Sequence, residues 1–463
     1  MNPRVLKKTA LYFIGNFSSK ILMAIIIPIY AFYIKSEELG YFDYSQTLMS
    51  ILVPIAFLSI WEAVLKFTIH SNSGKEDVFN VSVSVSVFSS IIIIACGILV
   101  GLFASVSYLP HIMLMFVLYG MVQVWQFIAR GLEKTKVYIL SGIVGTVCNF
   151  AAMLVFVVWL RMELYGLYIS YLISQLAMLV LLELKLKAFK YFKIKKLKLP
   201  LLKKMIFFSA PLTLNAISAW MFSGFSRFII TNKLGAFENG LYAFSNKFAI
   251  VISMLGTVVT MAVIEEAIIS RKENRDRAGE GKSASELYVI LMSIALVALP
   301  AITLFYNFIK GSEYYASLVY VPGLLLYASF STLASNIGAQ FQALDKTKYQ
   351  FITTVIGSVI TVVISVCFIG RFGTAAVVIS QIIGALVMVI SRYIAVNKYM
   401  CYRLDLSKML VATVVYLAVS AVCVVASAKT VCIVLALVVA CALALNKQLI
   451  GEFVKKICNS NKK

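Results

Sequence analysis

Apolar residues occur along the chain in long runs that are separated by short polar turns. Runs such as VFSSIIIIACGILVGLFASV and LVATVVYLAVSAVCVVAS have about the 20 residues that cross a bilayer as a helix. The alternation of apolar and polar residues that marks a membrane β-barrel is absent, and backbone groups in lipid must bond within their own segment. The pattern therefore predicts an all-α polytopic membrane protein.

The polar turns divide the apolar sequence into about fourteen predicted transmembrane helices. The first follows a basic N-terminus, as a signal peptide does, but it lacks a small-x-small cleavage site and contains Asn16, Lys20 and Pro28. We therefore interpret it as a span. Proline residues such as Pro54 and Pro211 are expected to bend some of the spans. The predicted spans cover residues 9–34, 42–69, 81–106, 111–129, 137–160, 164–183, 205–231, 241–269, 287–309, 314–341, 349–369, 374–396, 409–428 and 430–446.

The distribution of charge supports this topology. The chain carries 42 Lys and Arg against 20 Asp and Glu, a net charge of +22. With the N-terminus inside, 31 of the basic residues lie on the inner side, six on the outer side and five within spans. The positive-inside rule then places both termini in the cytoplasm. A basic inner face beside anionic lipids explains the charge without nucleic acid, including that of the segment KLKAFKYFKIKKLKLPLLKK, which we call the basic linker.

Short motifs recur in the same order in the two halves of the chain. GLEKTKVYILSGIVGTV from Gly131 returns as ALDKTKYQFITTVIGSV from Ala343, and ISQ at 173–175 returns at 379–381. EELGYFDYSQ at 37–46 matches FENGLYAFSN at 237–246, with the shared pairs Glu38/Glu238, Gly40/Gly240 and Ser45/Ser245. These matches predict a duplicated six-helix unit, and because six is even, the two repeats are parallel.

The duplication gives a predicted domain organisation. Residues 1–184 form an N-terminal six-helix bundle, and residues 205–397 form a C-terminal one. The basic linker, residues 185–204, joins them in the cytoplasm. Residues 398–463 add two further helices and a basic cytoplasmic tail.

Chemical motifs argue against an enzyme. The outer loops are too short for a catalytic domain, and Walker, GxSxG, HExxH and paired-carboxylate patterns are absent. The eight cysteines and two histidines have no metal-ligand spacing. We therefore expect no cofactor and no metal, and a duplicated bundle with short loops favours a transporter.

Ionisable residues within the spans are the strongest candidates for function, because each costs about 2.5–3.5 kcal/mol at the centre of a membrane helix. The candidate substrate-binding cations are Lys20, Lys66, Arg227 and Lys247. Asn16 lies one helical turn before Lys20 on the same face. Snorkelling to the membrane surface is the alternative for Arg227 and Lys247, and Arg392 is interpreted as a snorkelling anchor.

Two further groups accompany these cations. Trp220, Ser223 and Arg227 share one helical face and offer an aromatic ring beside a cation, which suits a sugar, although packing or a membrane-interface belt is the alternative for a Trp. Glu62 lies four residues before Lys66, so the two can pair, and Glu62 is the candidate coupling acid.

The in-span charges do not repeat with the scaffold. At an offset of 200 residues Lys20 falls on Trp220, Ile27 on Arg227, and Thr47 on Lys247. Charges that only held the bundle together would be expected to repeat with it. Their asymmetry predicts an asymmetric substrate with an anionic end.

Several segments resemble a known family. ELGYFDYSQTLMSILVPIAFLSIWEAVLKF, KLGAFENGLYAFSNKFAIVISMLG and QALDKTK, together with the plan of six, six and two spans, are similar to the polysaccharide-biosynthesis family. These are the O-unit (Wzx-type) flippases of the multidrug/oligosaccharidyl-lipid/polysaccharide (MOP) exporter superfamily. The resemblance implies a V-shaped bundle in the bacterial inner membrane, with a cationic central cavity lined by the helices that carry the candidate cations and Glu62.

The resemblance also implies a substrate and partners. Such proteins move undecaprenyl-pyrophosphate-linked oligosaccharide repeat units to the outer leaflet for surface polysaccharide synthesis by alternating access. The expected partners are this lipid-linked oligosaccharide, anionic membrane lipids and a polysaccharide polymerase or ligase, and H⁺ or Na⁺ is the candidate coupling ion.

Three other functions remain as alternatives. A cation-coupled multidrug exporter of the same superfamily often has a coupling acid in its first span, and this chain has none there. A major-facilitator carrier would show Asp-Arg and Gly-Arg signatures in the turn HSNSGKEDVFN, which lacks them. A membrane glycan polymerase or ligase would have a large outer loop with Arg and His.

Overall fold

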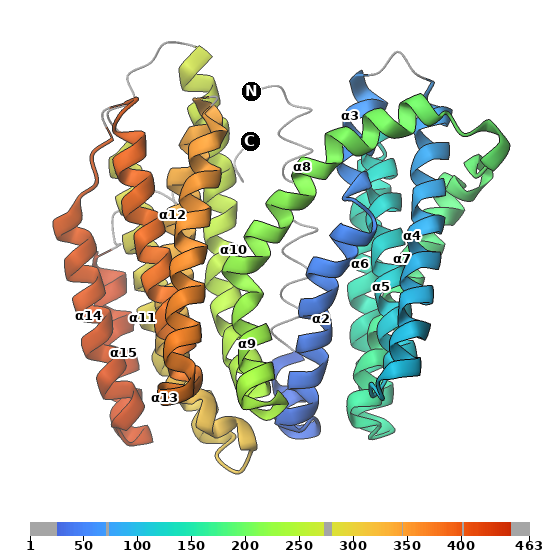
Figure 1. The fold of residues 1–463 in the computed structure, drawn as a ribbon. Helices are drawn as coiled ribbons and strands as arrows, with labels where there is room; N and C mark the ends of the chain where they lie inside the picture. Colours follow the sequence, from blue (N-terminus) through green and yellow to red (C-terminus); the bar gives the residue numbers. More distant parts are fainter. Residues whose placement is uncertain (1–25, 71–73, 273–279, 345, 401, 446–463) are drawn as a thin grey trace, which may run out of the picture. The chain divides into compact units, whose positions relative to one another are not determined.

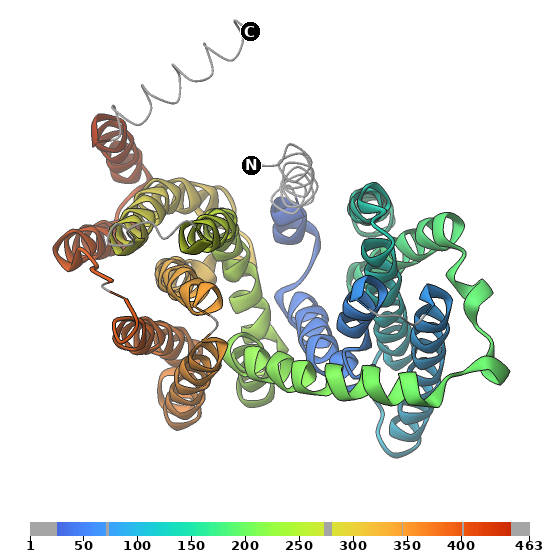
Figure 2. The ribbon, with the colours of Figure 1, turned by 90° about the horizontal axis from the view of Figure 1, so that it is seen from above.

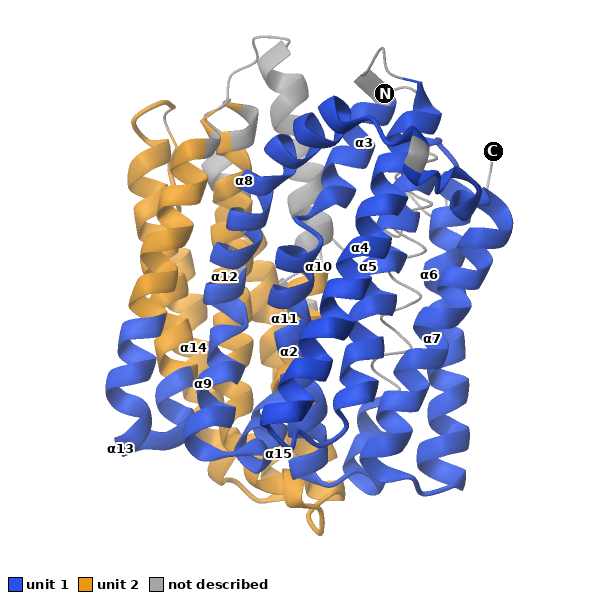
Figure 3. Ribbon diagram, turned by 45° about the vertical axis from the view of Figure 1, so that its right-hand side comes forward, with its two compact units in different colours: residues 1–244, 362–377 blue, residues 245–361, 378–463 orange. Residues whose placement is uncertain are grey.

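The computed structural model describes residues 26–70, 74–272, 280–344, 346–400 and 402–445, and within these ranges every regular element is a helix (Figure 1). This confirms the predicted all-α class. Two compact units divide the chain (Figure 3): the first comprises Met1–Phe244 and Val362–Val377, and the second comprises Ser245–Thr361 and Val378–Lys463. The predicted repeat boundaries remain a prediction.

The first unit contains α2 to α9, the start of α10 and the middle of α13, residues 362–377. In it α5 packs against α2, α3, α4 and α7, and α6 and α7 pack along each other. Figure 2 views α4 to α7 close to their axes. Fully buried aromatic side chains, among them Trp125 and Tyr168, fill the space between these helices. The helices are α2 (Ser36–Ala56), α3 (Ile60–His70), α4 (Lys75–Phe103), α5 (Leu109–Gly131), α6 (Thr135–Met153), the π-helix η1 (Leu154–Trp159), α7 (Glu163–Leu186), the 3₁₀-helices η2 (Ala188–Tyr191) and η3 (Ile194–Lys196), α8 (Leu199–Ser223), α9 (Phe225–Leu234) and α10 (Ala236–Lys272).

The predicted span 42–69 is broken between α2 and α3, which are bent by 54°. Pro54 lacks the N–H of a continuous helix, and Leu58 and Ser59 take positive φ values of 51° and 45°. The freed carbonyl of Ala56 accepts a 2.8 Å hydrogen bond from the hydroxyl of Ser89. The expectation that some prolines bend their spans is confirmed here.

The second unit is built around α11, which packs against α12, α14 and α15. The hydroxyl of Tyr416 in α14 donates a 2.8 Å hydrogen bond to the carbonyl of Pro322 in α12. The unit contains most of α10 and the two ends of α13, whose middle, residues 362–377, belongs to the first unit. Its further helices and the bounds of α13 are α11 (Glu280–Phe308), the 3₁₀-helix η4 (Glu313–Tyr320), α12 (Val321–Ala343), α13 (Thr347–Val396), α14 (Leu406–Val425) and α15 (Ala428–Leu445).

Candidate membrane spans agree with the predicted class but do not establish the predicted number. Over the described residues nine helices are long and apolar enough to cross a membrane, or ten if bent α2 and α3 form one span. One of the nine, within α13, holds two predicted spans, because its backbone leaves the helical conformation at Gly373 (φ 59°, ψ −146°). Most of the first predicted span lies outside the described residues. The number fourteen therefore stays a prediction.

Arg392 is not the snorkelling anchor that the sequence analysis expected. Its side chain is only 4% exposed. Nε donates to Thr353 Oγ1 at 3.1 Å, Nη2 donates to Thr354 Oγ1 at 2.8 Å, and Nη1 donates to the carbonyl of Ala334. Hydrogen bonds within the protein thus replace those that water would give the guanidinium, and Arg392 joins α12 to both parts of α13.

Equivalent positions of the two predicted repeats meet within the first unit. A Cβ on Gly40 would lie 1.8 Å from the carbonyl oxygen of Ala236, and a Cβ on Gly240 would lie 1.8 Å from that of Ser36. The hydroxyl of Ser36 donates to the carbonyl of Phe237 at 2.8 Å. The first turns of α2 and α10 are therefore in direct backbone contact, which only glycine at both positions permits.

Candidate functional site

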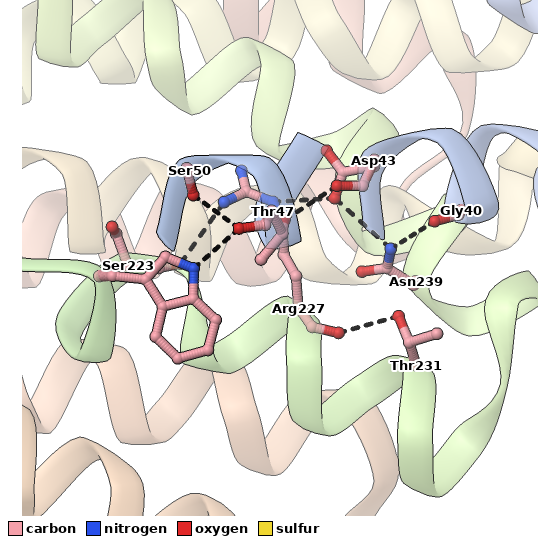
Figure 4. A network of polar contacts seen from close by, with 9 residues as sticks. Gly40, Asp43, Thr47, Ser50, Ser223, Arg227, Thr231 and Asn239 are labelled. Carbon is pink, nitrogen blue, oxygen red and sulfur yellow. Dashed lines mark hydrogen bonds and ion pairs between the residues drawn. The ribbon is translucent and has the colours of Figure 1, made fainter. Parts of the chain in front are cut away.

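The joint between α8 and α9 positions three of the predicted site residues. Gly224 separates the two helices, and a Cβ there would lie 2.3 Å from Nε1 of Trp220. Because Gly224 has no side chain, the indole can lie against the joint. Figure 4 shows Ser223 and Arg227 at this point. The indole of Trp220 lies against Gly224 in the same joint, so the structure brings the three predicted residues together.

Arg227 is paired with an acidic residue of α2. Its Nε lies 2.9 Å from Oδ2 of Asp43, and the two side chains are only 19% and 15% exposed. The Nε–H is not aimed at the carboxylate, so the contact is an ion pair by proximity. Nη1 also donates to the carbonyl of Ser223 at 3.4 Å, and the guanidinium lies 5.8 Å from the ring centroid of Tyr242.

Hydrogen bonds from neighbouring helices hold the acidic partner. Asn239 in α10 donates through Nδ2 to the carbonyl of Gly40 at 2.9 Å and to Oδ2 of Asp43 at 3.4 Å. Trp220 donates through Nε1 to the carbonyl of Thr47 at 3.0 Å, so its polar edge is occupied. The first half of α2 is thereby joined to α8, α9 and the start of α10 by polar contacts.

Asp43 is the site residue that the sequence analysis missed. It lies inside the motif EELGYFDYSQ, where it contributed only to the repeat match. At the offset of 200 residues it falls on Ala243, so it breaks the repeat as the in-span cations do. The same asymmetry test, applied to acidic residues, would have found it.

Glu62 and Lys66 lie in α3, away from Arg227. Asp43 and Glu62 are separated by roughly 25–30 Å of helix at 1.5 Å per residue. Nζ of Lys66 lies 3.9 Å from the ring centroid of Phe208 in α8, and in the described part of the chain it forms no ion pair with Glu62. The expected pairing of these two residues is therefore wrong. Glu62 is half-buried in α3.

The remaining predicted residues are placed as follows. Lys247 is half-buried in α10 and belongs to the second unit. Lys20 and Asn16 lie outside the described residues. Among the residues that are described, no group of three or more His, Cys, Asp or Glu could hold a metal ion.

The geometry at Arg227 suits reversible binding of an anion. The guanidinium has planar donors that match the oxygens of a phosphate, and one nearby carboxylate now neutralises its charge. An anionic ligand has to compete with Asp43 for this cation. The arrangement can therefore bind an anion and release it.

The chain matches a protein family in sequence and a known transporter in fold. The family described as "Polysaccharide biosynthesis protein" matches residues 5–264. No curated protein sequence matches the chain. A solved structure titled lipid II flippase MurJ, in an inward closed conformation, has a TM-score of 0.68 at 15% identity and covers 95% of this chain and 100% of its own.

A second structure has a related fold. An inward-facing multidrug resistance MATE family transporter of the MOP superfamily gives a TM-score of 0.64 at 15% identity, over 82% of this chain and 95% of its own. At these identities the two similarities establish the fold. The predicted similarity to the fold of MOP exporters is confirmed, and the plan of six, six and two spans stays a prediction.

Proposed function

The chain belongs to the polysaccharide biosynthesis protein family, and on this premise we propose that it is a flippase for undecaprenyl-pyrophosphate-linked oligosaccharide repeat units. It moves them from the inner to the outer leaflet of the bacterial cytoplasmic membrane for O-antigen, capsule or exopolysaccharide synthesis. The observation that carries the proposal is the family match. The matched residues, 5–264, include the site residues Asp43, Trp220 and Arg227. The MOP-type fold supports it.

Binding of the pyrophosphate is proposed to involve an exchange of partners at Arg227. A pyrophosphate carries at least two negative charges, and a low-dielectric cavity strengthens its attraction to fixed cations. Oδ2 of Asp43 lies 2.9 Å from Nε of Arg227 and neutralises its charge. The arriving phosphate takes Arg227, while Asn239 continues to donate to Asp43. Lys20, Lys66 and Lys247 supply further positive charge in the proposed cationic cavity between the bundles, and Asn16, Trp220 and Ser223 contact the sugars or the phosphate.

Alternating access returns the empty protein to the inner side. Glu62, half-buried in α3, is the proposed coupling group for H⁺ or Na⁺. The protein itself makes and breaks no covalent bond, so it is not an enzyme. A polysaccharide polymerase or ligase is the partner that consumes the translocated repeat unit.

The proposed orientation places both termini and the basic linker in the cytoplasm. Cysteine labelling in intact cells tests it, with single cysteines at Lys190 in the linker and at Arg371 between predicted spans eleven and twelve. We expect a membrane-impermeant reagent to label only the second. Labelling at Lys190 from outside contradicts the orientation.

Loss of the gene tests the substrate directly. We expect a deletion strain to accumulate lipid-linked repeat units, because no enzyme that makes them is lost. Without flipping these units stay in the inner leaflet, so an external glycosidase cannot reach them in right-side-out vesicles. Purified protein in liposomes should restore their access to the outer leaflet. Absence of the precursor itself in the deletion strain contradicts a flippase and points to an enzyme.

A cation-coupled multidrug exporter is the second candidate, because the MATE-type transporter shares the fold with a TM-score of 0.64. It predicts that the deletion strain becomes sensitive to cationic drugs while its surface glycan stays normal. Glu62 is then the coupling acid. Normal drug resistance together with lost surface glycan rejects this candidate.

A further inference from the structure

The basic linker is fixed to the first unit along most of its length. Glu183, near the end of α7, accepts hydrogen bonds through Oε2 from the backbone N–H of Ala188 at 3.0 Å and from Nε1 of Trp125 at 2.8 Å. Its Oε1 accepts from the N–H of Phe189 at 3.2 Å. Ala188 and Trp125 are fully buried. One carboxylate therefore joins the start of the linker to α5 and α7.

The start of α4 holds the second part of the linker. Asn80, itself 5% exposed, donates through Nδ2 to the carbonyl of Lys193 at 3.1 Å and accepts through Oδ1 from its N–H at 3.0 Å. The rings of Phe79 and Tyr191 meet edge to face at 5.4 Å, and Lys198 pairs with Asp77 at 2.7 Å. Such two-way bonding of one backbone residue fixes the register of the linker.

The fixed linker presents basic and apolar side chains to the outside together. Large apolar side chains are exposed between the lysines: Phe189 by 42%, Ile194 by 57% and Leu199 by 66%. Among the linker residues whose side chains the structure describes, the exposed lysines are Lys185, Lys187, Lys190, Lys193, Lys196, Lys198, Lys203 and Lys204. Acidic residues are absent from the linker sequence, and among the described residues Asp77 is the one acid that forms an ion pair with a linker lysine, Lys198.

We propose that the basic linker is a docking surface for anionic phospholipid headgroups, held rigidly at the membrane surface by Glu183 and Asn80. The location supports this occupant, because candidate spans α4, α7 and α8 begin or end at the linker (Figure 1). Lysines bind the headgroup phosphates, and the apolar side chains between them enter the interfacial layer. A nucleic acid or a soluble acidic protein would leave the three apolar side chains in water.

The experiment compares two sets of charge substitutions in nanodiscs that contain equal amounts of phosphatidylglycerol and phosphatidylcholine. Lipids that remain bound after detergent extraction are quantified by mass spectrometry. The linker variant replaces four lysines by Gln at Lys187, Lys190, Lys193 and Lys196. The matched control replaces four exposed lysines of other inner turns by Gln, at Lys75, Lys136, Lys348 and Lys398.

We expect phosphatidylglycerol to be enriched by roughly fivefold or more on the wild-type protein, as the sum of several lysine contacts. The linker variant should lose most of this enrichment, and the control should keep it. Equal losses in both variants would indicate a general charge effect and overturn the proposal, as would a lack of enrichment on the wild type or retention of it by the linker variant.

A second variant tests the rigid attachment separately from the charge. Asn80→Ala keeps every lysine but removes both hydrogen bonds to Lys193. We expect faster amide hydrogen exchange across residues 188–194 and a lower phosphatidylglycerol enrichment. Unchanged enrichment with faster exchange would mean that a flexible basic segment suffices, and would refute the rigid surface. The outcome is independent of what the protein transports.

Discussion

At the residue scale, the ion pair between Asp43 and Arg227 makes a prediction about stability. Replacing Asp43 by Asn leaves a guanidinium that is 19% exposed without its carboxylate partner. Removing one partner of a buried pair is strongly destabilising, and with the remaining exposure we expect a loss of about 2–3 kcal/mol. Thermal unfolding of the purified protein in detergent measures it as a lower melting temperature.

The double variant Asp43→Asn with Arg227→Gln is the control for this prediction, because it removes both charges together. It should melt above the Asp43→Asn single variant, which gives a coupling energy between the two sites. Strictly additive losses would show that the two side chains do not interact energetically.

Arg392 makes a second prediction at this scale, because the structure buries it and the sequence pattern had placed it at the surface. Its three hydrogen bonds join α12 to both parts of α13. Arg392→Met should lower the melting temperature clearly, since Thr353 and the carbonyl of Ala334 lose their donor. Lys398→Gln, at an exposed position a few residues further on, should change it little. Equal behaviour of the two variants would restore the snorkelling interpretation.

At the element scale, the contact between the first turns of α2 and α10 depends on two glycines. Gly40→Ala would place a Cβ 1.8 Å from the carbonyl oxygen of Ala236, so the backbones have to move apart. We expect a large drop in melting temperature. Gly142→Ala is the matched control within α6, because a Cβ there meets nothing within 4 Å, and Ala favours a helix over Gly by about 1 kcal/mol. A neutral Gly40→Ala variant would contradict the close contact.

The sequence predicts where the helices lie, but not how they bend or how the basic linker runs between them. Length and hydropathy were enough to find the helices, since burial in lipid dictates both. The break after Pro54 could be anticipated, but not its 54° angle, because it depends on contacts with other helices. Ser89 donates to the carbonyl of Ala56, and Thr213 donates to the side-chain hydroxyl of Ser59. The fixed path of the basic linker was also unpredictable. It depends on Glu183 and Asn80, two polar residues that hold the linker through its backbone groups, and such contacts leave no trace in a residue pattern.

At the scale of the whole molecule, a repeated scaffold carries charges that do not repeat. The pair Gly40 and Gly240 keeps the repeat and holds backbone against backbone. Asp43 and Arg227 break the repeat and form an ion pair beside that contact. Sequence comparison of the halves identified Arg227 but could not supply its partner, because pairing across helices requires the fold. The site therefore carries less free positive charge than a count of cations implied.

The ion pair between Asp43 and Arg227 also affects transport in the proposed mechanism. Arg227→Ala and Lys20→Ala should each abolish flipping of the lipid-linked oligosaccharide in liposomes that contain equal amounts of folded protein, because each removes a cation proposed to hold the pyrophosphate. Lys20→Arg should keep partial activity, since charge at that depth matters more than donor geometry. Asp43→Asn should bind the lipid-linked pyrophosphate more tightly and release it more slowly, because the competing carboxylate is gone. Wild-type flipping rates in both alanine variants would show that these cations are structural and that the cationic-cavity mechanism is wrong.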